Sequence, residues 1–436
     1  MDSYSETLNR IYNLRGGVID LRLDRMDQAL SLFDHPEKKF PSFHIAGTNG
    51  KGSTAAMLHR ILSQSGYRVA LYTSPHLISF TERIRIGDEE IAPNEVVGLA
   101  DEIWDRTTAA KVSLTFFEFV TVMGFIYFAR HKIDVAVIEV GLGGRLDATN
   151  LVRPVVSLIS TISKDHEAYL GSDLLSIARE KGGIIKKGIP VVCGALPTEV
   201  AAFLKNIADE HEAPAYFFGR DFTFSLKNGD LFDYIGMKWR LNSVDVALRG
   251  RHQKRNAALA LGALEITAQD FPVNEAALRE GLKTVRWPGR FEIIQDRPTV
   301  ILDGAHNGEG VKALVEEIEN FREQRKVKLL FASMEDKDWQ RMLESLSEVA
   351  DEIVLTRVNM ERCAEPHRLA AQLSGKVPNF AIEDSRSALE YVLDRAESND
   401  IILVAGSLYL LGEIRPILQE IAGAKSGQKN KPTFPP

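Results

Sequence analysis

The chain has 436 residues with ordinary apolar and charged contents of 44% and 26%, which suit a globular protein of two or three domains. A formal net charge of −7 argues against a general nucleic-acid binder, and no apolar run is long enough to span a membrane. Two distant cysteines, Cys193 and Cys363, exclude a disulfide framework, and the polar N-terminus does not resemble a signal peptide. We therefore expect a cytoplasmic protein.

The first half of the chain alternates short apolar strands with helices. The runs are apolar on both faces, which is typical of parallel strands covered by helices. Between about 217 and 248, alternating stretches such as FTFSL and KWRLN predict a small antiparallel insertion, and a helix follows at 253–267. Strands are predicted at 43–46, 68–73, 133–140, 155–161 and 190–195, and helices at 53–65 and 118–130.

The last third of the chain returns to strand–helix alternation and can form a complete α/β domain. Its strands are predicted at 299–303, 328–332, 352–357, 379–382 and 401–405. The expected architecture is therefore α/β throughout. A P-loop parallel-sheet ATPase domain with an antiparallel insertion (1–294) would precede a smaller Rossmann-like domain (295–436).

The sharpest local motif is AGTNGKGST at 46–54, between a predicted strand and a predicted helix. Glycines there let backbone N–H groups approach phosphate oxygens, and the helix N-terminus adds partial positive charge. Lys51 would reach the β- and γ-phosphates. The literal P-loop pattern fails at Ile45 and Gly52, so a glycine-rich turn with a surface lysine is the alternative.

Three further polar segments follow predicted strands, where ligands gather in open α/β sheets. EVGLGGRLDATN begins with Glu139, a buried carboxylate that needs a salt bridge or a metal. SKDHE offers His166 as a metal ligand or a helix cap, and Lys181 downstream could be a solvated lysine. LDGAHN places Asp303 and His306 where they could position substrates, or where they could simply form a turn.

Together these segments resemble the folylpolyglutamate synthase/dihydrofolate synthase family, which belongs to the Mur ligase superfamily of ATP-dependent amide ligases. GTNGKGS at 47–53 is specific to the superfamily. SPHL at 74–77, FTERIRI at 80–86 and EVGLGGRLDATN are specific to the folate branch, and the match runs from about 19 to 409. The resemblance implies that ATP drives ligation of L-glutamate to dihydropteroate, to the glutamate tail of folates, or to both, through an acyl phosphate.

The resemblance also implies an ATP site, two magnesium sites and a glutamate site on a C-terminal ligase domain; a monomer is expected. The expected phosphate loop is Gly47, Thr48, Asn49, Gly50, Lys51, Gly52 and Ser53, and the further nucleotide contacts are Asn256, Arg290 and Asp303. The expected metal ligands are Ser74, Glu139, His166 and Lys181, the last as a carbamate (N6-carboxylysine). The expected catalytic residues are Lys51, Lys181, His166, Asp303 and His306.

The acceptor and the incoming glutamate are implied to bind at several separate segments. Phe117 would stack on a pteridine ring, and Asp147 would accept its N–H groups. Arg22 stands where the loop of bifunctional members has glycine, so folylpolyglutamate synthase activity alone is an alternative. The implied acceptor residues are Ile19, Asp20, Leu21, Arg83, Thr115, Phe116, Phe117, Glu118, Leu146, Asp147 and Ala148, and Ser407 and Tyr409 match a glutamate-holding segment.

Three other functions compete with this interpretation. A peptidoglycan-precursor ligase would need an extra N-terminal domain, for which the glycine loop at Gly47 leaves no room. A P-loop phosphotransferase or regulatory NTPase would not need DGAHN, HQKRNA at 252–257 or PGRFE at 288–292. A nucleotide-binding protein that has lost catalysis is disfavoured, because the candidate catalytic residues are all present.

Overall fold

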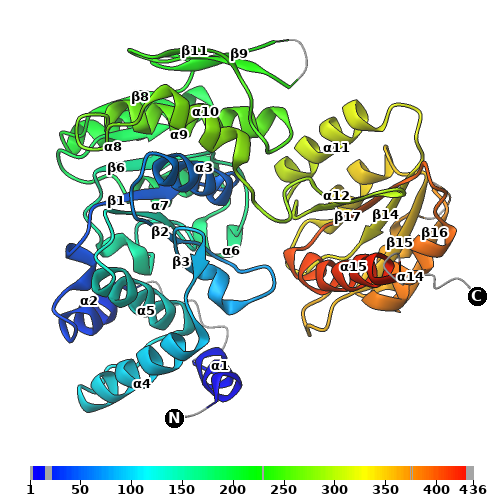
Figure 1. Ribbon diagram of the computed structural model, residues 1–436, viewed down its shortest axis with the longest axis horizontal. Coiled ribbons are helices and arrows are strands. Elements are labelled where there is room, and N and C mark those ends of the chain that lie inside the picture. Colours follow the sequence, from blue (N-terminus) through cyan, green and yellow to red (C-terminus); the bar gives the residue numbers. More distant parts are fainter. Residues whose placement is uncertain (1–2, 15–21, 228–229, 374, 376, 429–436) are drawn as a thin grey trace, which may run out of the picture. The chain divides into compact units, whose positions relative to one another are not determined.

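The computed structural model describes residues 3–14, 22–227, 230–373, 375 and 377–428 (Figure 1). The chain forms two compact units, the first made of Met1–Ala247 with His252–Arg286 and the second of Leu248–Arg251 with Trp287–Pro436. The expected boundary between 294 and 295 falls inside strand β12 (Glu292–Asp296), which pairs with β13 (Thr299–Asp303) of the second unit. The division therefore lies before this strand, at Arg286.

The N-terminal unit is built on an eight-stranded sheet. Its strands are β1 (Ser42–Ala46), β2 (Val69–Tyr72), β3 (Ile84–Ile86), β4 (Glu89–Glu90), β5 (Val135–Glu139), β6 (Val156–Ile159), β7 (Val191–Cys193) and β8 (Ala215–Phe217). The order is β4-β3-β2-β5-β1-β6-β7-β8, parallel from β2 to β8 with β3 and β4 as an antiparallel edge. Every residue of β1, β2, β5 and β6 is buried, as expected for parallel strands covered on both faces.

Helices cover this sheet in distinct groups. They are α1 (Tyr4–Tyr12), α2 (Asp24–Ser31), α3 (Lys51–Gln64), α4 (Pro93–Ala109), α5 (Phe116–Arg130), α6 (Glu167–Leu170), α7 (Leu174–Gly182), α8 (Thr198–Glu210), α9 (Arg251–Ile266) and α10 (Glu275–Thr284), with short 3-10 turns η1 (Pro36–Lys38), η2 (Phe80–Arg83) and η3 (Ala148–Leu151). Helix α3 packs on β1, β2 and β5, and α10 packs on α3. Helices α1, α2, α4 and α5 share an apolar core and lie together in Figure 1.

The expected antiparallel insertion is present as a separate three-stranded sheet of β9 (Thr223–Leu226), β10 (Phe232–Ile235) and β11 (Arg240–Val244). It carries the FTFSL and KWRLN stretches and lies beside α9 and α10 in Figure 1. A buried carboxylate ties it to α9. Glu265 accepts hydrogen bonds from the Tyr234 hydroxyl at 3.0 Å and from the Trp239 amide at 2.8 Å.

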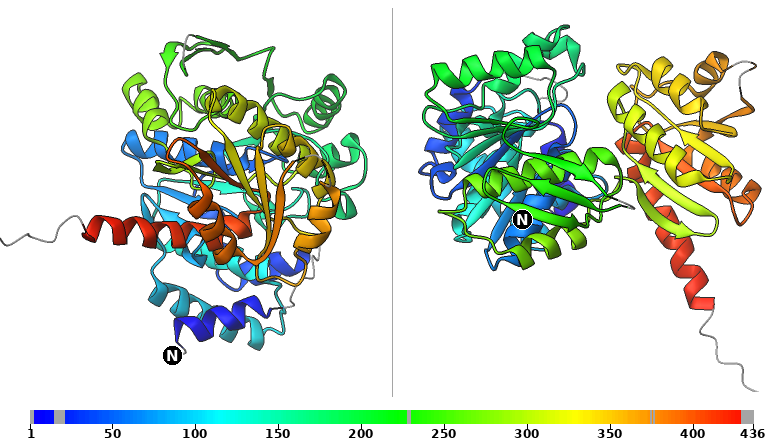
Figure 2. Two further views of the ribbon diagram at one scale, coloured as in Figure 1. Left: turned by 90° about the vertical axis from the view of Figure 1, so that its right-hand side faces the viewer. Right: turned by 90° about the horizontal axis from the view of Figure 1, so that it is seen from above.

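The C-terminal unit holds a six-stranded sheet in the order β12-β13-β17-β14-β15-β16. Its other strands are β14 (Val327–Phe331), β15 (Glu352–Arg357), β16 (Asn379–Asp384) and β17 (Ile401–Ala405), and its helices are α11 (Gly308–Arg322), α12 (Trp339–Ser347), α13 (Pro366–Gln372), α14 (Ser385–Arg395) and α15 (Leu408–Gln428). All five predicted strands are present, and the α/β class predicted for both domains is confirmed. In Figure 2 the last turns of α15 extend past the rest of this unit.

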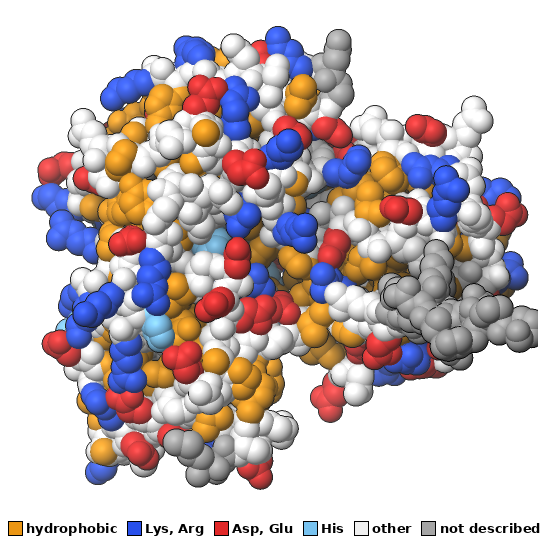
Figure 3. All heavy atoms as spheres, in the orientation of Figure 1, with side chains coloured by type: hydrophobic (Ala, Val, Ile, Leu, Met, Phe, Trp, Pro, Cys, Tyr) orange, Lys and Arg blue, Asp and Glu red, His pale blue; other side chains and the backbone are white. Residues whose placement is uncertain are grey.

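The surface carries charges of both signs. On the face drawn in Figure 3, Lys and Arg side chains are interspersed with Asp and Glu rather than gathered in one basic field. Among the described residues, no helix is both long and apolar enough to cross a bilayer. Both free cysteines, Cys193 and Cys363, are buried.

Candidate active site

The predicted phosphate loop joins the end of β1 to the start of α3 and is held by the end of β6. The Thr48 amide donates to the Thr161 carbonyl at 2.8 Å, and the Asn49 amide donates to the Thr161 hydroxyl at 3.0 Å. Ser160 Oγ donates to the Asn49 carbonyl at 2.6 Å. Gly50 caps α3 with φ +85°, and a Cβ there would meet the Asn256 amide, so only glycine fits. Hydrogen bonds to Ser160 and Thr161 therefore hold the backbone of the loop, and Asn256 lies beside Gly50.

Two lysines converge on one carbonyl of this loop. Lys51 Nζ donates to the Gly47 carbonyl at 2.9 Å and to the Thr48 carbonyl at 3.1 Å. Lys181 Nζ, from α7, donates to the same Gly47 carbonyl at 3.0 Å. Lys181 is 4% exposed, and burial together with the charge of Lys51 lowers its pKa to about 7. A solvated lysine, the alternative reading of Lys181, does not match this burial.

The expected metal ligands are brought together only in part. Glu139 ends β5, Ser74 follows the neighbouring strand β2, and the Ser74 amide donates to Glu139 Oε2 at 3.2 Å. His166 precedes α6 as its N-cap residue with φ +51°, its side chain is 40% exposed, and its Nε2 lies 3.9 Å from Asp165 Oδ1. In the described part of the chain, no three His, Cys, Asp or Glu side chains are grouped to hold a metal ion. Of the four expected metal ligands, the structure thus brings Ser74 and Glu139 into contact.

Two of the predicted acceptor residues form a helix cap. Thr115 caps α5 by accepting from the Glu118 amide, while Glu118 Oε2 accepts from the Thr115 amide at 2.7 Å. The buried Glu118 carboxylate also pairs with Arg25 of α2, whose Nη2 lies 2.7 Å from Oε1. These contacts use Thr115 and Glu118 to start α5 and to anchor α2.

The neighbouring aromatic residues Phe116 and Phe117 pack against other predicted segments. A Cβ at Gly141 would collide with the Phe117 ring, so this ring lies directly against the loop that follows β5. The Tyr12 ring stacks on Phe116 with centroids 5.5 Å apart, and the Arg83 guanidinium lies 5.3 Å from the Phe116 centroid. Arg83 Nε donates to His76 Nδ1 at 2.8 Å, and burial and Arg83 lower the pKa of His76 to about 4.

Asp147 is buried inside the loop rather than pointing to solvent. Its Oδ1 accepts from the Thr149 amide at 3.0 Å and from the Thr149 hydroxyl at 2.5 Å, and its Oδ2 accepts from the Leu142 amide at 2.9 Å. Burial raises its pKa, opposed by these hydrogen bonds. Asp147 thereby shapes the stretch that presents its neighbours Leu146 and Ala148. Ile19, Asp20 and Leu21 lie outside the described residues, and the adjacent Arg22 is exposed.

The C-terminal candidates meet at the carboxyl ends of β13 and β17, where Asp303 pairs with Ala405. The buried Asp303 carboxylate accepts from the Phe291 and Ala305 amides at 2.8 and 2.9 Å. Burial raises its pKa, and Arg290 opposes that shift. His306 Nδ1 lies 2.8 Å from the Gly304 carbonyl. Ser407 Oγ accepts from the Tyr409 amide at 3.1 Å, and the half-exposed Tyr409 hydroxyl accepts from Arg362 at 3.2 Å.

Several site residues were not predicted. Ser160 and Thr161 follow β6 and could have been found by the strand-end rule applied to the other segments. Gln253 lies three residues before Asn256 on α9, and its Nε2 donates to Ser53 Oγ at 3.3 Å. His76 stands inside the SPHL motif. Arg25 had no local signal, because its partner Glu118 lies far along the chain.

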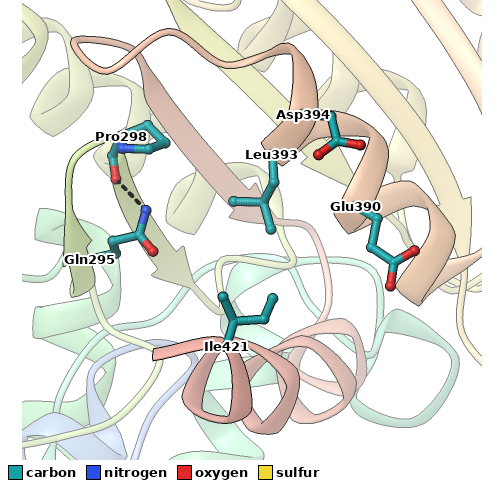
Figure 4. Close-up of a pocket in the computed structure, with 6 residues that line it drawn as sticks. All are labelled: Gln295, Pro298, Glu390, Leu393, Asp394 and Ile421. Carbon is teal, nitrogen blue, oxygen red and sulfur yellow. Dashed lines mark hydrogen bonds between the residues drawn. The ribbon is translucent and has the colours of Figure 1, made fainter. Parts of the chain in front are cut away.

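A separate pocket of about 430 Å³ lies elsewhere in the C-terminal unit (Figure 4). It is lined by Gln295, Pro298, Glu390, Leu393, Asp394 and Ile421. Pro298 precedes β13, whereas Asp303 ends that strand. The pocket therefore lies at the amino end of β13, and the predicted residues lie at its carboxyl end. Ligands in open α/β sheets bind at carboxyl ends, so this pocket is not our candidate site.

Comparison with known proteins gives consistent matches over nearly the whole chain. Residues 45–264 match the Mur ligase middle domain and residues 289–408 match the Mur ligase glutamate ligase domain. A Bacillus subtilis dihydrofolate synthase/folylpolyglutamate synthase is 35% identical over 91% of this chain and 95% of its own length. Escherichia coli FolC in complex with DHPP and ADP has a TM-score of 0.90 at 30% identity, covering 97% and 99% of the two chains. A bifunctional folylpolyglutamate synthase/dihydrofolate synthase with Mn, AMPPNP and L-glutamate bound has a TM-score of 0.86 at 33% identity, covering 96% and 98% of the two chains.

Proposed function

Because the chain belongs to the dihydrofolate synthase/folylpolyglutamate synthase family of the Mur ligases, we propose how its own residues carry out the ligation typical of that family. The protein is an ATP-dependent ligase that joins L-glutamate to dihydropteroate, to the glutamate tail of folates, or to both. The observation that best supports our residue assignment is the convergence of Lys51 and Lys181 on the Gly47 carbonyl of the phosphate loop.

The chemistry requires activation of a carboxylate, which is a poor electrophile. An acceptor carboxylate oxygen attacks the γ-phosphorus of ATP, the bond to the β,γ-bridging oxygen breaks, and ADP leaves. The glutamate amine then attacks the acyl carbon. The tetrahedral intermediate collapses by breaking the carbon–oxygen bond to the phosphate, the nitrogen loses its proton, and an amide and inorganic phosphate result.

Lys51 is the residue that we assign to charge stabilisation at the phosphates. Its ammonium donates to the Gly47 and Thr48 carbonyls of its own loop, and we propose that it turns from them toward the triphosphate. The loop amides and the start of α3 supply further positive potential. A fixed cation beside a transferring phosphoryl group offsets negative charge that develops in the transition state.

Ser74 and Glu139 fit a magnesium ion, because Mg²⁺ accepts one or two protein oxygens and takes its remaining ligands from phosphates and water. When bound, the ion would neutralise phosphate charge and polarise the transferring group. We assign His166 as an additional ligand, supported by its place after β6, and ATP with a divalent cation as the cofactors. A Yersinia pestis relative has been solved in complex with AMPPNP and a Mn ion.

Lys181 is the residue that we propose to carry a carbamate. The neutral amine attacks carbon dioxide, a carbon–nitrogen bond forms, and one proton leaves. A buried lysine with a pKa of about 7 holds the neutral amine that this step needs at physiological pH. The resulting carboxylate would serve as an oxygen ligand for a second magnesium.

We place the acceptor against the wall formed by Phe116, Phe117 and the loop from Gly141 to Ala148. Arg83 lies beside this wall and is suited to an acceptor carboxylate. We propose both dihydrofolate synthase and folylpolyglutamate synthase activity, with folylpolyglutamate synthase alone as the alternative favoured by Arg22.

The C-terminal unit is the one that we propose to serve the incoming glutamate. The candidate residues lie on adjoining segments at the carboxyl ends of the strands; they are Arg290, Asp303, His306, Ser407 and Tyr409. The segments after β13 and β17 are joined there, because the Gly406 amide donates to the Ala305 carbonyl at 3.2 Å. Arg290 and Asp303 are also our candidates for contacts to the nucleotide. A guanidinium, a hydroxyl and an imidazole suit the carboxylates and amine of an amino acid.

The test is phosphate release from ATP with each acceptor and with L-glutamate, alone and together. We expect release that depends on both cosubstrates, with products one glutamate heavier by mass spectrometry. Turnover with dihydropteroate and with a reduced folate would establish both activities. Phosphate release that neither cosubstrate changes would contradict the assignment.

A further inference from the structure

His44 is a histidine at the centre of β1, inside the N-terminal sheet. Its side chain is fully buried, and it lies between neighbouring strands β5 and β6, paired with Ile138 and Ser157. A central parallel strand covered on both faces normally carries apolar residues at such a position. Burying an imidazole there costs free energy unless it has hydrogen-bond partners.

One of its ring nitrogens has such a partner. His44 Nε2 lies 2.9 Å from the hydroxyl of Thr149, at the start of η3. Its other nitrogen, Nδ1, is buried and makes no hydrogen bond with any of the described residues. The histidine is therefore satisfied on one side only, and that side faces the loop that follows β5.

The contact continues to Asp147. The Thr149 hydroxyl is 2.5 Å from Asp147 Oδ1, and the Thr149 amide also donates to Oδ1 at 3.0 Å. Asp147 Oδ2 accepts from the Leu142 amide at 2.9 Å, which closes the loop on itself. A continuous chain of side chains thus runs from the middle of the sheet to the acceptor loop.

The direction of these hydrogen bonds follows from proton counting. Several donors surround the Asp147 carboxylate, among them the Leu142 and Thr149 amides and the Thr149 hydroxyl, so its ionised form is the acceptor. The Thr149 hydroxyl has one proton and donates it to Asp147, so toward His44 it can only accept. His44 must then carry a proton on Nε2, from which it donates to Thr149. Burial and the nearby Lys186 cation lower its pKa to about 3, which agrees with a neutral ring.

We propose that His44 is a positioning residue that acts through Thr149 on Asp147 and so sets the conformation of the acceptor-binding loop from Leu142 to Ala148. This inference rests on the proposed acceptor site at that loop. The His44 proton fixes the Thr149 hydroxyl in the rotamer that donates to Asp147. Without it, Thr149 loses one partner, and Asp147 loses the constraint that keeps its neighbours Leu146 and Ala148 in place.

The test compares Michaelis constants in the full-length enzyme. In His44→Leu and Thr149→Val we expect the KM for the pterin acceptor to rise about five- to tenfold, the fold-change of one lost hydrogen bond. The KM for ATP should stay within twofold of wild type. His44→Gln, whose side-chain amide can donate from a similar position, and Thr149→Ser should restore most of the acceptor KM. A purely structural role would raise both constants together and would overturn the proposal.

Asp147→Asn separates failure of this inference from failure of the acceptor site. An unchanged acceptor KM in Asp147→Asn would show that the loop does not bind the acceptor. A raised acceptor KM in Asp147→Asn with no change in His44→Leu would leave the site standing and overturn the role of His44.

If His44→Leu does not fold, the tautomer of His44 can be measured in the wild-type protein instead. In histidine ¹⁵N spectra at pH 7, with the resonance assigned from His44→Gln, we expect a neutral ring protonated at Nε2. A ring protonated at Nδ1, or an imidazolium, would contradict the proposed chain.

Discussion

At the scale of single residues, the site depends on polar side chains that are buried yet hydrogen-bonded. Lys181, Glu139, Asp147 and Asp303 are each less than a tenth exposed. Burial shifts the pKa of Lys181 downward and those of Asp147 and Asp303 upward. The sequence predicted burial for Glu139 at the end of an apolar strand but not for Lys181. The residue types were predictable from motifs, whereas the environment that sets their protonation depends on the fold.

Lys51→Ala should lower turnover by about 10²- to 10³-fold without unfolding the protein. Lys51 Nζ donates to the Gly47 and Thr48 carbonyls of its own loop, so we expect its removal to act on the transferring phosphoryl group rather than on the fold. Losing one such charge-stabilising group costs about 10²- to 10³-fold in kcat. Steady-state phosphate release measures the loss, circular dichroism checks the fold, and Lys51→Arg is the charge-conserving control. Activity above a tenth of wild type would show that the loop has another role.

Lys181 should make activity depend on carbon dioxide in a pH-dependent way. Its pKa is lowered to about 7, so the neutral amine dominates above pH 7 and the ammonium below it. Enzyme depleted of carbon dioxide should regain activity with bicarbonate faster at pH 8 than at pH 6. A ¹³C carbamate resonance from labelled bicarbonate, absent in Lys181→Arg, provides the readout. Full activity in carbon dioxide-free buffer would contradict the carbamate.

At the scale of elements, helix capping and the position of a strand at the edge of its sheet explain the differences between the predicted and the observed helices and strands. Helix α5 begins at Phe116 rather than at 118, because Thr115 and Glu118 form a capping box. Strand β12 was not predicted, since its residues are half-exposed at a sheet edge and lack a clear apolar pattern. The central parallel strands of both sheets were predictable because they are apolar runs, and site segments followed from their ends. The edge strands β3, β4 and β8 were not predicted.

The cap and ion pair of α5 should stabilise the fold. Thr115→Ala should lower the free energy of unfolding by about 1 kcal/mol through the lost cap. Glu118→Leu should lower it by about 3 kcal/mol or more, because Arg25 would stay buried without its carboxylate. Urea unfolding measures both.

The matched control is the double variant Arg25→Met/Glu118→Leu, which removes both charges. It should be more stable than Glu118→Leu alone. Equal stability of the single and double variants would show that the ion pair has no coupling energy.

At the scale of the whole molecule, each of the two units has its own sheet and core, and long-range contacts within a unit complete its site. The two-domain organisation was predictable from the return of strand–helix alternation. The Arg25–Glu118 pair and the seat of the phosphate loop on Thr161 were not, because they join segments distant in sequence. Roles of site residues follow from the family resemblance and stay predictions until tested.

Stability of the whole protein should fall on mild acidification. Burial lowers the pKa of His44 to about 3 and those of His59 and His76 to about 4, below the unfolded value of 6.5. The unfolded chain therefore binds more protons, so these residues' contribution is complete above pH 6.5 and is lost as the pH falls toward 4. We expect a loss of several kcal/mol in the free energy of unfolding between pH 7 and pH 5, on the basis of about 1.4 kcal/mol per pKa unit for each group.

Urea denaturation across that pH range measures this loss. His59→Leu should flatten the profile, because one buried base is removed from the balance. Stability that is flat from pH 7 to pH 5 would show that these histidines titrate normally in the folded state.

Ligation through an acyl phosphate transfers one oxygen atom from the acceptor carboxylate to phosphate, and this transfer can be measured. Acceptor labelled with ¹⁸O in its reacting carboxylate would be turned over with ATP and L-glutamate, and the released phosphate analysed by mass spectrometry. We predict that each phosphate carries one ¹⁸O atom from the acceptor, because the attacking carboxylate oxygen leaves with the phosphoryl group. Phosphate without ¹⁸O, formed together with the amide product, would contradict the acyl phosphate and with it this mechanism.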